Sequence, residues 1–203
     1  MKKTKILASM LVLAATCSGA YADNYARQTI QAYLPAYVNI KVEDCMLKSN
    51  INAETGNLTE AFNSVFKISS NDNIDLYLRA ETMAENVGAV NGFYKKNGTV
   101  YIILGHTGVR PTATAIENIR QGNTDPEQNQ NAIAYPVSSV KLTGNFTKEP
   151  VFVDDKARYE FSVKQGETTA TTTISANVDK TTYSYNDKSG NYEAYIILTD
   201  TTT

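Results

Sequence analysis

The chain of 203 residues carries 19 basic and 21 acidic side chains, which gives a formal net charge of −2 and a sequence pI of about 5.5. This acidic balance argues against nucleic acid and against an anionic membrane surface as partners. The sequence has one histidine and two cysteines. Because zinc sites use several imidazoles or thiolates at defined spacing, the sequence predicts no such metal centre.

Residues 1–22 have the pattern of a secretory signal peptide. Three lysines open it, an apolar stretch follows over residues 6–15, and Ala20-Tyr21-Ala22 provides a small-x-small cleavage site. We therefore expect cleavage after Ala22, export through the Sec pathway and a secreted or cell-surface mature chain. No later window is apolar enough to predict a membrane span.

The cysteines leave one alternative open. A lipoprotein would be anchored through Cys17, but Thr16 and Ala14 depart from the usual Leu-x-Gly/Ala-Cys pattern. Once the leader is removed, Cys45 is the single cysteine and can form no internal disulfide. Its expected role is that of a small buried hydrophobic residue, the alternative being a reactive or intermolecular thiol.

The first stretch after the leader alternates between apolar and polar or amphipathic side chains. This period of two predicts an extended strand over residues 30–42 with one buried face. The apolar positions are Ile30, Ala32, Leu34, Ala36, Val38, Ile40 and Val42. Pro35 offers no N–H to a ladder, so the strand should lie at a sheet edge, or break near residue 35 and pass to another sheet.

Two further strands follow around a polar loop. Alternation over residues 62–68 and 74–80 predicts strands, and Ser69 to Asn73 separates them. We expect these two strands to form a hairpin with one solvated face.

The Asn97-Gly98 dipeptide predicts another hairpin, because a type I′ turn needs positive φ at both central residues. Val100 to Leu104, which follows, is apolar on both faces. It should be a central strand covered on both sides, or a strand whose outer face meets a partner.

A short helix is expected over residues 112–121, with Gly122 as its stop. The following residues 123–131 form a polar loop without an apolar anchor, which predicts a mobile excursion. Strands then return over residues 133–142, where Pro136 indicates an edge or a bend.

The pattern in the last part of the chain also predicts strands. Residues 159–163 and 171–178 alternate and are separated by a turn at Gln165-Gly166, and residues 192–198 close the chain as an apolar strand. The whole pattern predicts an all-β fold, an immunoglobulin-like antiparallel β-sandwich of roughly eight to ten strands with at most one short helix. We expect residues 23–203 to form one such domain.

The sequence offers little for catalysis or metal binding. His106, at the end of a predicted strand, is expected to hydrogen-bond a turn, and no nucleophile motif accompanies it. Two acidic groups have the oxygens that calcium prefers but lack the glycine-punctuated calcium loop. These are Asp72, Asp75, Glu81 and Glu85, and the pair Asp154 and Asp155. We therefore expect solvated carboxylates, no catalytic residue, no metal, no cofactor and no enzyme.

Three stretches together carry a resemblance. They are QTIQAYLPAYVNIKVED at residues 28–44, the pattern Phe66-x-Ile68-Ser69-Ser70-Asn71, and the apolar strand near the C-terminus. They resemble the exported fimbrial or pilus-subunit-like β-sandwiches of bacterial surfaces. The resemblance implies that the N-terminal strand completes the sandwich of a neighbouring subunit by β-augmentation, inserting Ile30, Leu34, Val38 and Ile40.

Two hypotheses about function follow. The first is a non-enzymatic structural subunit of a bacterial surface filament or coat, which self-associates through exposed edge strands. Its assembly strand would use Ile30, Ala32, Leu34, Val38, Ile40 and Val42. The alternative is a monomeric secreted adhesin, or a module that binds carbohydrate, protein or a host cell-surface ligand through loop residues 106–131.

Overall fold

The structure is a computed structural model, which describes residues 31–123, 125 and 128–200. The chain divides into two units, residues 1–34 and 35–203. Of the first unit only residues 31–34 are described, and they are exposed and outside any helix or strand. The predicted signal peptide and Ile30 lie outside the described residues.

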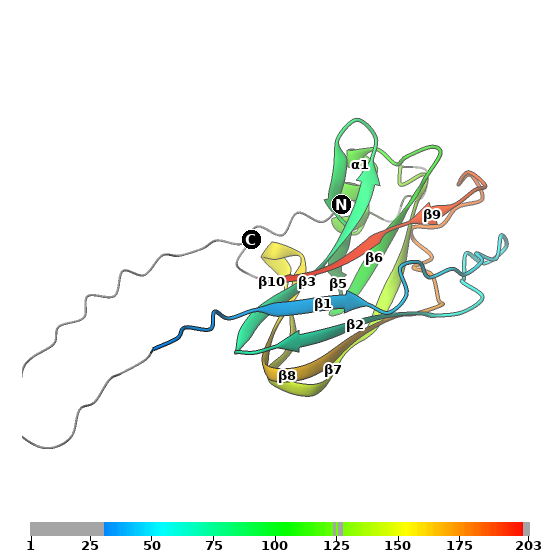
Figure 1. Cartoon of the computed structure of the whole chain (residues 1–203). Coiled ribbons are helices and arrows are strands. Elements are labelled where there is room, and N and C mark those ends of the chain that lie inside the picture. The colour runs from blue at the N-terminus through cyan, green and yellow to red at the C-terminus, as the bar shows by residue number, and fades with distance from the viewer. Residues whose placement is uncertain (1–30, 124, 126–127, 201–203) are drawn as a thin grey trace, which may run out of the picture. The chain divides into compact units, whose positions relative to one another are not determined.

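The described part of the second unit consists of strands with one short α-helix and a single 3₁₀ turn (Figure 1). The strands form one 10-stranded antiparallel sheet that is curled. This confirms the predicted all-β class, whereas the immunoglobulin-like arrangement stays a prediction. The elements are β1 (Val38–Val42), β2 (Phe62–Ser70), β3 (Ile74–Ala84), β4 (Gly88–Asn91), β5 (Phe93–Lys96), β6 (Thr99–His106), α1 (Ala113–Arg120), β7 (Ala132–Val153), η1 (Asp154–Lys156), β8 (Arg158–Ile174), β9 (Tyr192–Glu193) and β10 (Tyr195–Asp200).

The long hairpin of β7 and β8 lies at the middle of the sheet, in the order β1-β2-β8-β7-β6-β5. Its register shifts at several points, including the step after Gly144. Gly144 and Gly166 have φ angles of 105° and 119°, and a Cβ at Gly144 would collide with the Glu167 carbonyl. Bulges and glycines of this kind let a strand bend without ending. The turn predicted at Gln165-Gly166 is therefore wrong, because β8 runs through it.

The hairpin predicted between β2 and β3 is also wrong. Both strands pair with β8, β2 along Gly166 to Ile174 and β3 along Arg158 to Val163. They run in the same direction on one edge of β8, since β7 occupies its other edge. A 17-residue β8 offers enough edge for both strands. The polar loop between them separates β2 from β3 without reversing the direction of the chain.

The turn between β5 and β6 confirms the predicted hairpin, with φ angles of 53° at Asn97 and 82° at Gly98. Strand β6 lies between β5 and β7, and its apolar residues face two clusters. Ile102 packs in the main core, whereas Ile103 packs against Ile116 and Ile119 of α1. The prediction of a central strand covered on both faces is confirmed.

Helix α1 forms where the sequence predicts it. The Thr112 side chain accepts a hydrogen bond from the Ala115 backbone N–H at 3.0 Å, as an N-cap does. Beyond the C-cap, Gly122 takes a φ of 78°. Ala115, Ile116 and Ile119 are buried. The buried face of this short amphipathic helix therefore covers the outer face of β6.

Strand β7 changes its pairing partner along its length, and the predicted C-terminal strand is divided in two. Residues Ala132 to Pro136 of β7 pair with β6, and pairing with β8 starts at Val137. Pro136 thus marks a transfer between partners inside the sheet, which fits the predicted bend and not an edge. The single strand predicted over residues 192–198 is two strands, because β9 pairs with β6 and β10 with β3.

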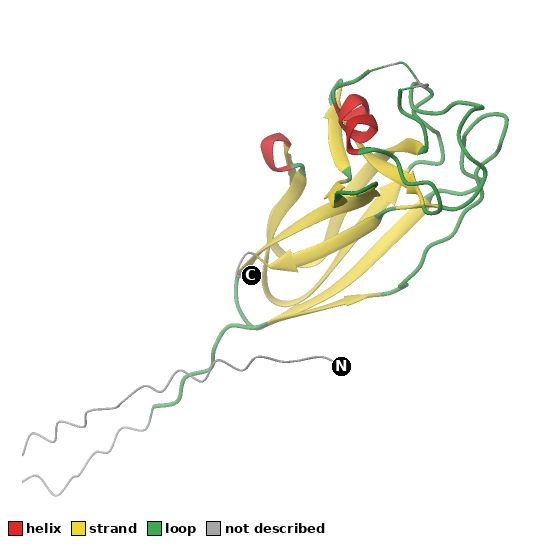
Figure 2. Cartoon of the chain, turned by 90° about the horizontal axis from the view of Figure 1, so that it is seen from above, coloured by secondary structure: helices red, strands yellow, loops and turns green. Residues whose placement is uncertain are grey.

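Aromatic side chains fill the main core. Phe93 meets Phe152 and Tyr159 edge-to-face, with centroid distances of 6.5 and 5.9 Å. The Tyr135 hydroxyl donates to the Gly56 carbonyl at 2.8 Å, which ties the loop before β2 to this core. Burial raises the pKa of Tyr159 to about 12. Most of the described loops gather at one end of the strands (Figure 2).

Candidate functional site

Strand β1 lies at the end of the sheet order and, among the described residues, pairs only with β2. The edge position predicted from Pro35 is confirmed. The register runs antiparallel from Val38 opposite Ser70 to Val42 opposite Phe66. The strand therefore pairs within its own chain, which the sequence could not decide.

The strand is shorter than its predicted bounds of residues 30–42. Val38 and Ile40 are half-buried against the main core, whereas Val42 is exposed. Ala32 and Leu34 are exposed and lie outside any strand, and Ile30 lies outside the described residues. The alternation is continuous in sequence, but the structure pairs only the part that follows Pro35 and Ala36.

The Asn71 side chain holds the chain just before β1. Its Oδ1 accepts from the Tyr37 backbone N–H at 2.7 Å, and its Nδ2 donates to the Pro35 carbonyl at 3.0 Å. The Tyr37 carbonyl accepts from Ser70 Oγ at 3.2 Å. The amide of Asn71 thus imitates a backbone peptide and extends the pairing of β1 by two residues. Sequence reasoning missed this role, because Asn71 stands among similar polar residues.

Large apolar side chains are exposed along this stretch. The exposed fractions are 86% for Tyr33, 76% for Leu34 and 55% for Tyr37. We call residues 31–37 the lead-in segment. Exposed tyrosine and leucine side chains suit protein contact, and β1, the edge strand that follows them in the sequence, offers unpaired backbone groups.

A second sheet edge is formed by β10, which among the described residues pairs only with β3. Its Leu198 is buried in the main core, whereas Tyr195 is 47% exposed. Tyr195 donates to Glu193 at 3.2 Å.

His106 is buried and both ring nitrogens have partners. Its Nδ1 accepts from the backbone N–H groups of Gly108 and Val109 at 2.9 and 2.7 Å. This assigns the neutral tautomer with the proton on Nε2, which donates to the Ser189 carbonyl at 3.2 Å. The expected structural role at a turn is confirmed. A ring so occupied presents no lone pair to a substrate.

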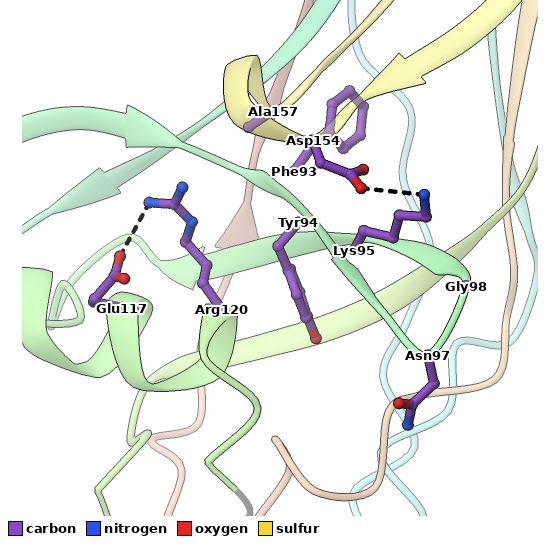
Figure 3. Close-up of a pocket in the computed structure, with 9 residues that line it drawn as sticks. All are labelled: Phe93, Tyr94, Lys95, Asn97, Gly98, Glu117, Arg120, Asp154 and Ala157. Carbon is purple, nitrogen blue, oxygen red and sulfur yellow. Dashed lines mark hydrogen bonds and ion pairs between the residues drawn. The ribbon is translucent and has the colours of Figure 1, made fainter.

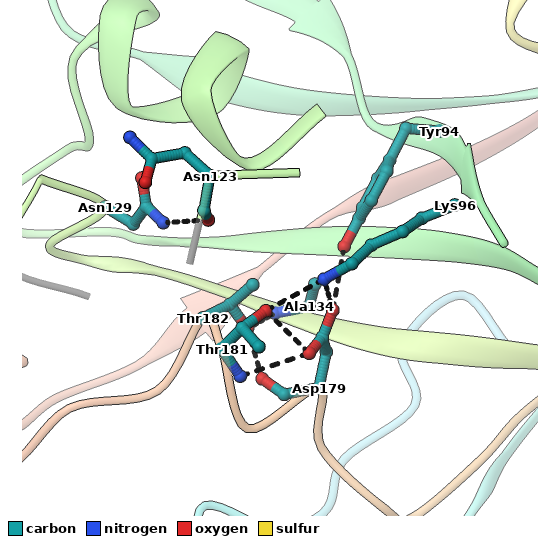
Figure 4. Close-up of polar contacts among 8 residues, drawn as sticks. All are labelled: Tyr94, Lys96, Asn123, Asn129, Ala134, Asp179, Thr181 and Thr182. Atoms are coloured by element: carbon teal, nitrogen blue, oxygen red, sulfur yellow. Dashed lines mark hydrogen bonds and ion pairs between the residues drawn. The ribbon is translucent and has the colours of Figure 1, made fainter. Parts of the chain in front are cut away.

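The neighbouring loop over residues 123–131 has polar anchors in place of apolar ones. Asn129 is fully buried and its Nδ2 donates to the Asn123 carbonyl at 3.1 Å (Figure 4). The Asn131 backbone N–H donates to Asp187 Oδ1 at 2.7 Å, and the Ser184 N–H donates to Oδ2 at 2.8 Å. Burial raises the pKa of the Asp187 carboxyl.

A polar cluster joins β5 to the segment after β8 (Figure 4). Lys96 Nζ lies 3.1 Å from Asp179 Oδ2, and the Asp179 side chain is only 9% exposed. The Thr181 hydroxyl and backbone N–H both donate to Asp179 Oδ1, at 2.8 and 3.1 Å. Burial pushes the pKa of Asp179 upward, but the hydrogen bonds from Thr181 and Lys96 outweigh it, so the pKa is lowered. Burial raises the pKa of Tyr94, whose hydroxyl points at the same carboxylate.

A pocket of about 440 Å³ opens between the β5–β6 turn, α1 and the turn after β7 (Figure 3). Its charged side chains are paired with one another, Lys95 with Asp154 at 3.3 Å and Arg120 with Glu117 at 3.1 Å. Exposed pairs of this kind contribute about 0–1 kcal/mol each. The pocket therefore has no unbalanced charge with which to select a ligand.

The other candidates take ordinary surface roles. Glu81 is an ion-pair partner of Arg79, and Asp75 accepts from Ser162 Oγ at 2.5 Å. Within the described part of the chain no three His, Cys, Asp or Glu side chains come together as a metal site. Cys45 is exposed, so its expected burial is wrong, since residues 43–46 directly after β1 are exposed. No helix in the described ranges is long and apolar enough to span a membrane.

No family model matches the sequence, and no curated protein matches it significantly.

Proposed function

We propose that this chain is an exported, non-enzymatic structural subunit of a bacterial surface filament or coat, which assembles through exposed strand edges. The observation that carries the proposal is the lead-in segment, where Tyr33, Leu34 and Tyr37 are exposed directly before an edge strand. A secreted monomer would be expected to bury or avoid such side chains.

The backbone around this segment supports the same role. Five residues of β1 pair with β2, and Asn71 holds residues 35 and 37 beyond them. The first strand is thereby fixed at the edge, while the side chains of residues 33 and 34 stay exposed. Added strands on such an edge gain main-chain hydrogen bonds for affinity and alternate side chains for specificity.

The edge itself carries little protection against strand addition. Lys41 is exposed on β1, and the ion pair between Lys67 and Glu43 is 3.1 Å long with both side chains well exposed. Charged residues on edges oppose unwanted pairing. Glu43 offsets Lys67, so Lys41 is the one charge on β1 that a copy adding to this edge would have to accommodate.

The alternative, a monomeric adhesin that binds through residues 106–131, has less support. The His106 ring and the Asn129 amide nitrogen are engaged within the chain, and the ion pairs of the nearby pocket are balanced.

The test uses two matched double variants of the mature chain, residues 23–203. Tyr33→Ser with Leu34→Ser removes the exposed apolar side chains of the lead-in segment. The control, Tyr185→Ser with Val109→Ser, removes similar exposed side chains elsewhere, with exposed fractions of 89% and 48%. Light scattering and negative-stain microscopy should show assembly in the control and its loss, by at least about tenfold in the association constant, in the first variant. Equal assembly of both variants would contradict the proposal.

A further inference from the structure

A second pocket, of about 360 Å³, lies where β3, β8 and β7 pair beside the 3₁₀ turn η1. Among the described residues that line it, the charged side chains are those of Asp75, Lys148, Lys156, Arg158 and Glu160. Three cations thus stand against two carboxylates, whereas the chain as a whole has a formal net charge of −2. The ion pairs of the pocket beside α1 are balanced, but this pocket has an excess of one positive charge.

The guanidinium group of Arg158 is held in place from two sides. Its Cζ lies 4.1 Å from the centroid of the Tyr77 ring, which is a cation–π contact. Its Nε and Nη2 donate to Glu160 Oε1 at 2.9 and 2.6 Å. A guanidinium has five N–H donors in one plane, so these bonds fix its orientation and leave the remaining donors for another acceptor.

The Glu160 carboxylate collects its donors on one oxygen. Its Oε1 also accepts from Lys156 Nζ at 3.1 Å. The hydrogen bonds from Arg158 and Lys156 lower the pKa of this carboxyl, which keeps it ionised at neutral pH. Because all three bonds end on Oε1, Oε2 can accept from a ligand hydroxyl.

A row of polar side chains crosses the sheet at the same pocket. Lys148 pairs opposite Ser162 between β7 and β8, and Ser162 pairs opposite Asp75 between β8 and β3. Paired residues project on the same face of a sheet, so these side chains are neighbours. Ser162 Oγ donates to Asp75 Oδ1 at 2.5 Å. Lys148 is exposed and has no ion pair within the described ranges, so it supplies the excess charge.

We infer that this pocket binds a sugar acid, a ring with one carboxylate and several hydroxyl groups. The ligand carboxylate would accept from Arg158 and Lys148, and its hydroxyl groups would donate to Glu160 and Asp75. One excess positive charge matches one negative charge. A phosphate group, at about −1.5 to −2, would exceed it and would be repelled by the two carboxylates. The pocket volume lies within the range of about 300–1,000 Å³ that is usual for small-molecule sites.

The first measurement is a saturation-transfer NMR titration of the mature chain with D-glucuronate, which suits weak binding in any state of assembly. For a ligand of about 13 non-hydrogen atoms with ordinary binding efficiency, the dissociation constant should be on the order of 1 mM. D-Glucose lacks the carboxylate and acetate lacks the ring, so each should bind at least about tenfold more weakly. Glucose, acetate or inorganic phosphate binding as tightly as glucuronate would overturn the inference.

Two variants test whether the binding belongs to this pocket. Lys148→Gln removes the excess charge and should weaken glucuronate binding at least about tenfold. Because Lys148 is exposed, this variant should keep the melting temperature of the parent. Arg158→Lys keeps the charge but loses the planar fork, so it should also weaken binding.

The control is Lys141→Gln, the same change on another exposed residue of β7, which should leave the affinity unchanged. Equal affinity in Lys148→Gln and Lys141→Gln would show that glucuronate binds elsewhere, and it would overturn the assignment to this pocket.

The methyl glycoside of glucuronate distinguishes two sources of the ligand. Its anomeric hydroxyl is blocked, as it is at the end of a polysaccharide chain. Affinity equal to that of the free acid would identify the end of an acidic polysaccharide, and a loss of at least about tenfold would identify the free acid. Both results support a sugar-acid site. The inference does not rest on the proposed assembly, because the described residues that line the pocket lie outside β1 and the lead-in segment.

Discussion

Single side chains hold the irregular parts of this fold by bonding to backbone groups. Asn71, His106 and Asp179 each do so, and the partner can be far away: Tyr37 is 34 residues from Asn71, and Ser189 is 83 residues from His106. The local half of the His106 network was predictable, because Gly108 and Val109 follow within three residues. The distant partners were not, because residue type alone does not say which loop lies opposite.

Asp179 should make the stability of the chain depend on acid pH. Its folded pKa is lowered, so its ionised form is stabilised by folding. That contribution is complete above the ordinary aspartate pKa of about 3.9 and is lost as the pH falls through the lower folded value. Asp179→Asn should cost about 1–3 kcal/mol of unfolding free energy at pH 7 and flatten the loss of stability below roughly pH 4.

Urea unfolding across this pH range checks the prediction. The control is Asp44→Asn, which removes an exposed carboxylate in the loop after β1 and should leave the pH profile nearly unchanged. An Asp179→Asn profile with the same acid slope as the parent would show that another carboxylate is responsible.

At the scale of elements, the buried faces of β2 and β3 followed from alternation, and the burial of β6 on both faces followed from its continuous apolar run. Helix α1 followed from its spacing and from Gly122 as its stop. The pairing of both β2 and β3 with β8 could not be predicted in this way. A polar loop such as residues 71–73 can either reverse the chain into a hairpin or separate two strands that run in the same direction. The second arrangement requires β8 to be long enough to pair with both strands. The length of β8 was not predicted, because Gly166 indicated a turn, whereas its positive φ belongs to a bend within the strand.

The edge position of β1 predicts a local effect for Asn71. Asn71→Ala removes the hydrogen bonds to Tyr37 and Pro35 but leaves the register with β2 intact. The Tyr37 amide should then exchange its hydrogen at least about tenfold faster, while the free energy of unfolding falls by only about 1 kcal/mol.

Hydrogen exchange of the mature chain measures this directly. Asn73→Ala, in the same loop, should leave the Tyr37 amide as protected as in the parent. Unchanged protection in Asn71→Ala would mean that the lead-in segment is held by something other than this side chain.

For the whole molecule, composition and turn spacing were enough to predict an all-β chain with one short helix. The curled sheet was not predictable, because it depends on strands that change partners: β7 passes from β6 to β8 at Pro136, and the last strand divides between β6 and β3. Each exchange joins residues far apart in sequence. The same limit applies to the first strand, whose alternation did not say which part would pair within its own chain.

The most direct test of the proposed function compares the mature chain with a chain that starts at Tyr37. The shorter chain keeps all of β1 and its pairing with β2 but loses most of the lead-in segment. Size-exclusion chromatography with light scattering, over a range of concentrations, should show assembly of the mature chain and a folded monomer for the shorter one. A mature chain that stays monomeric at high concentration, with residues 31–37 resistant to protease, would contradict assembly through this edge.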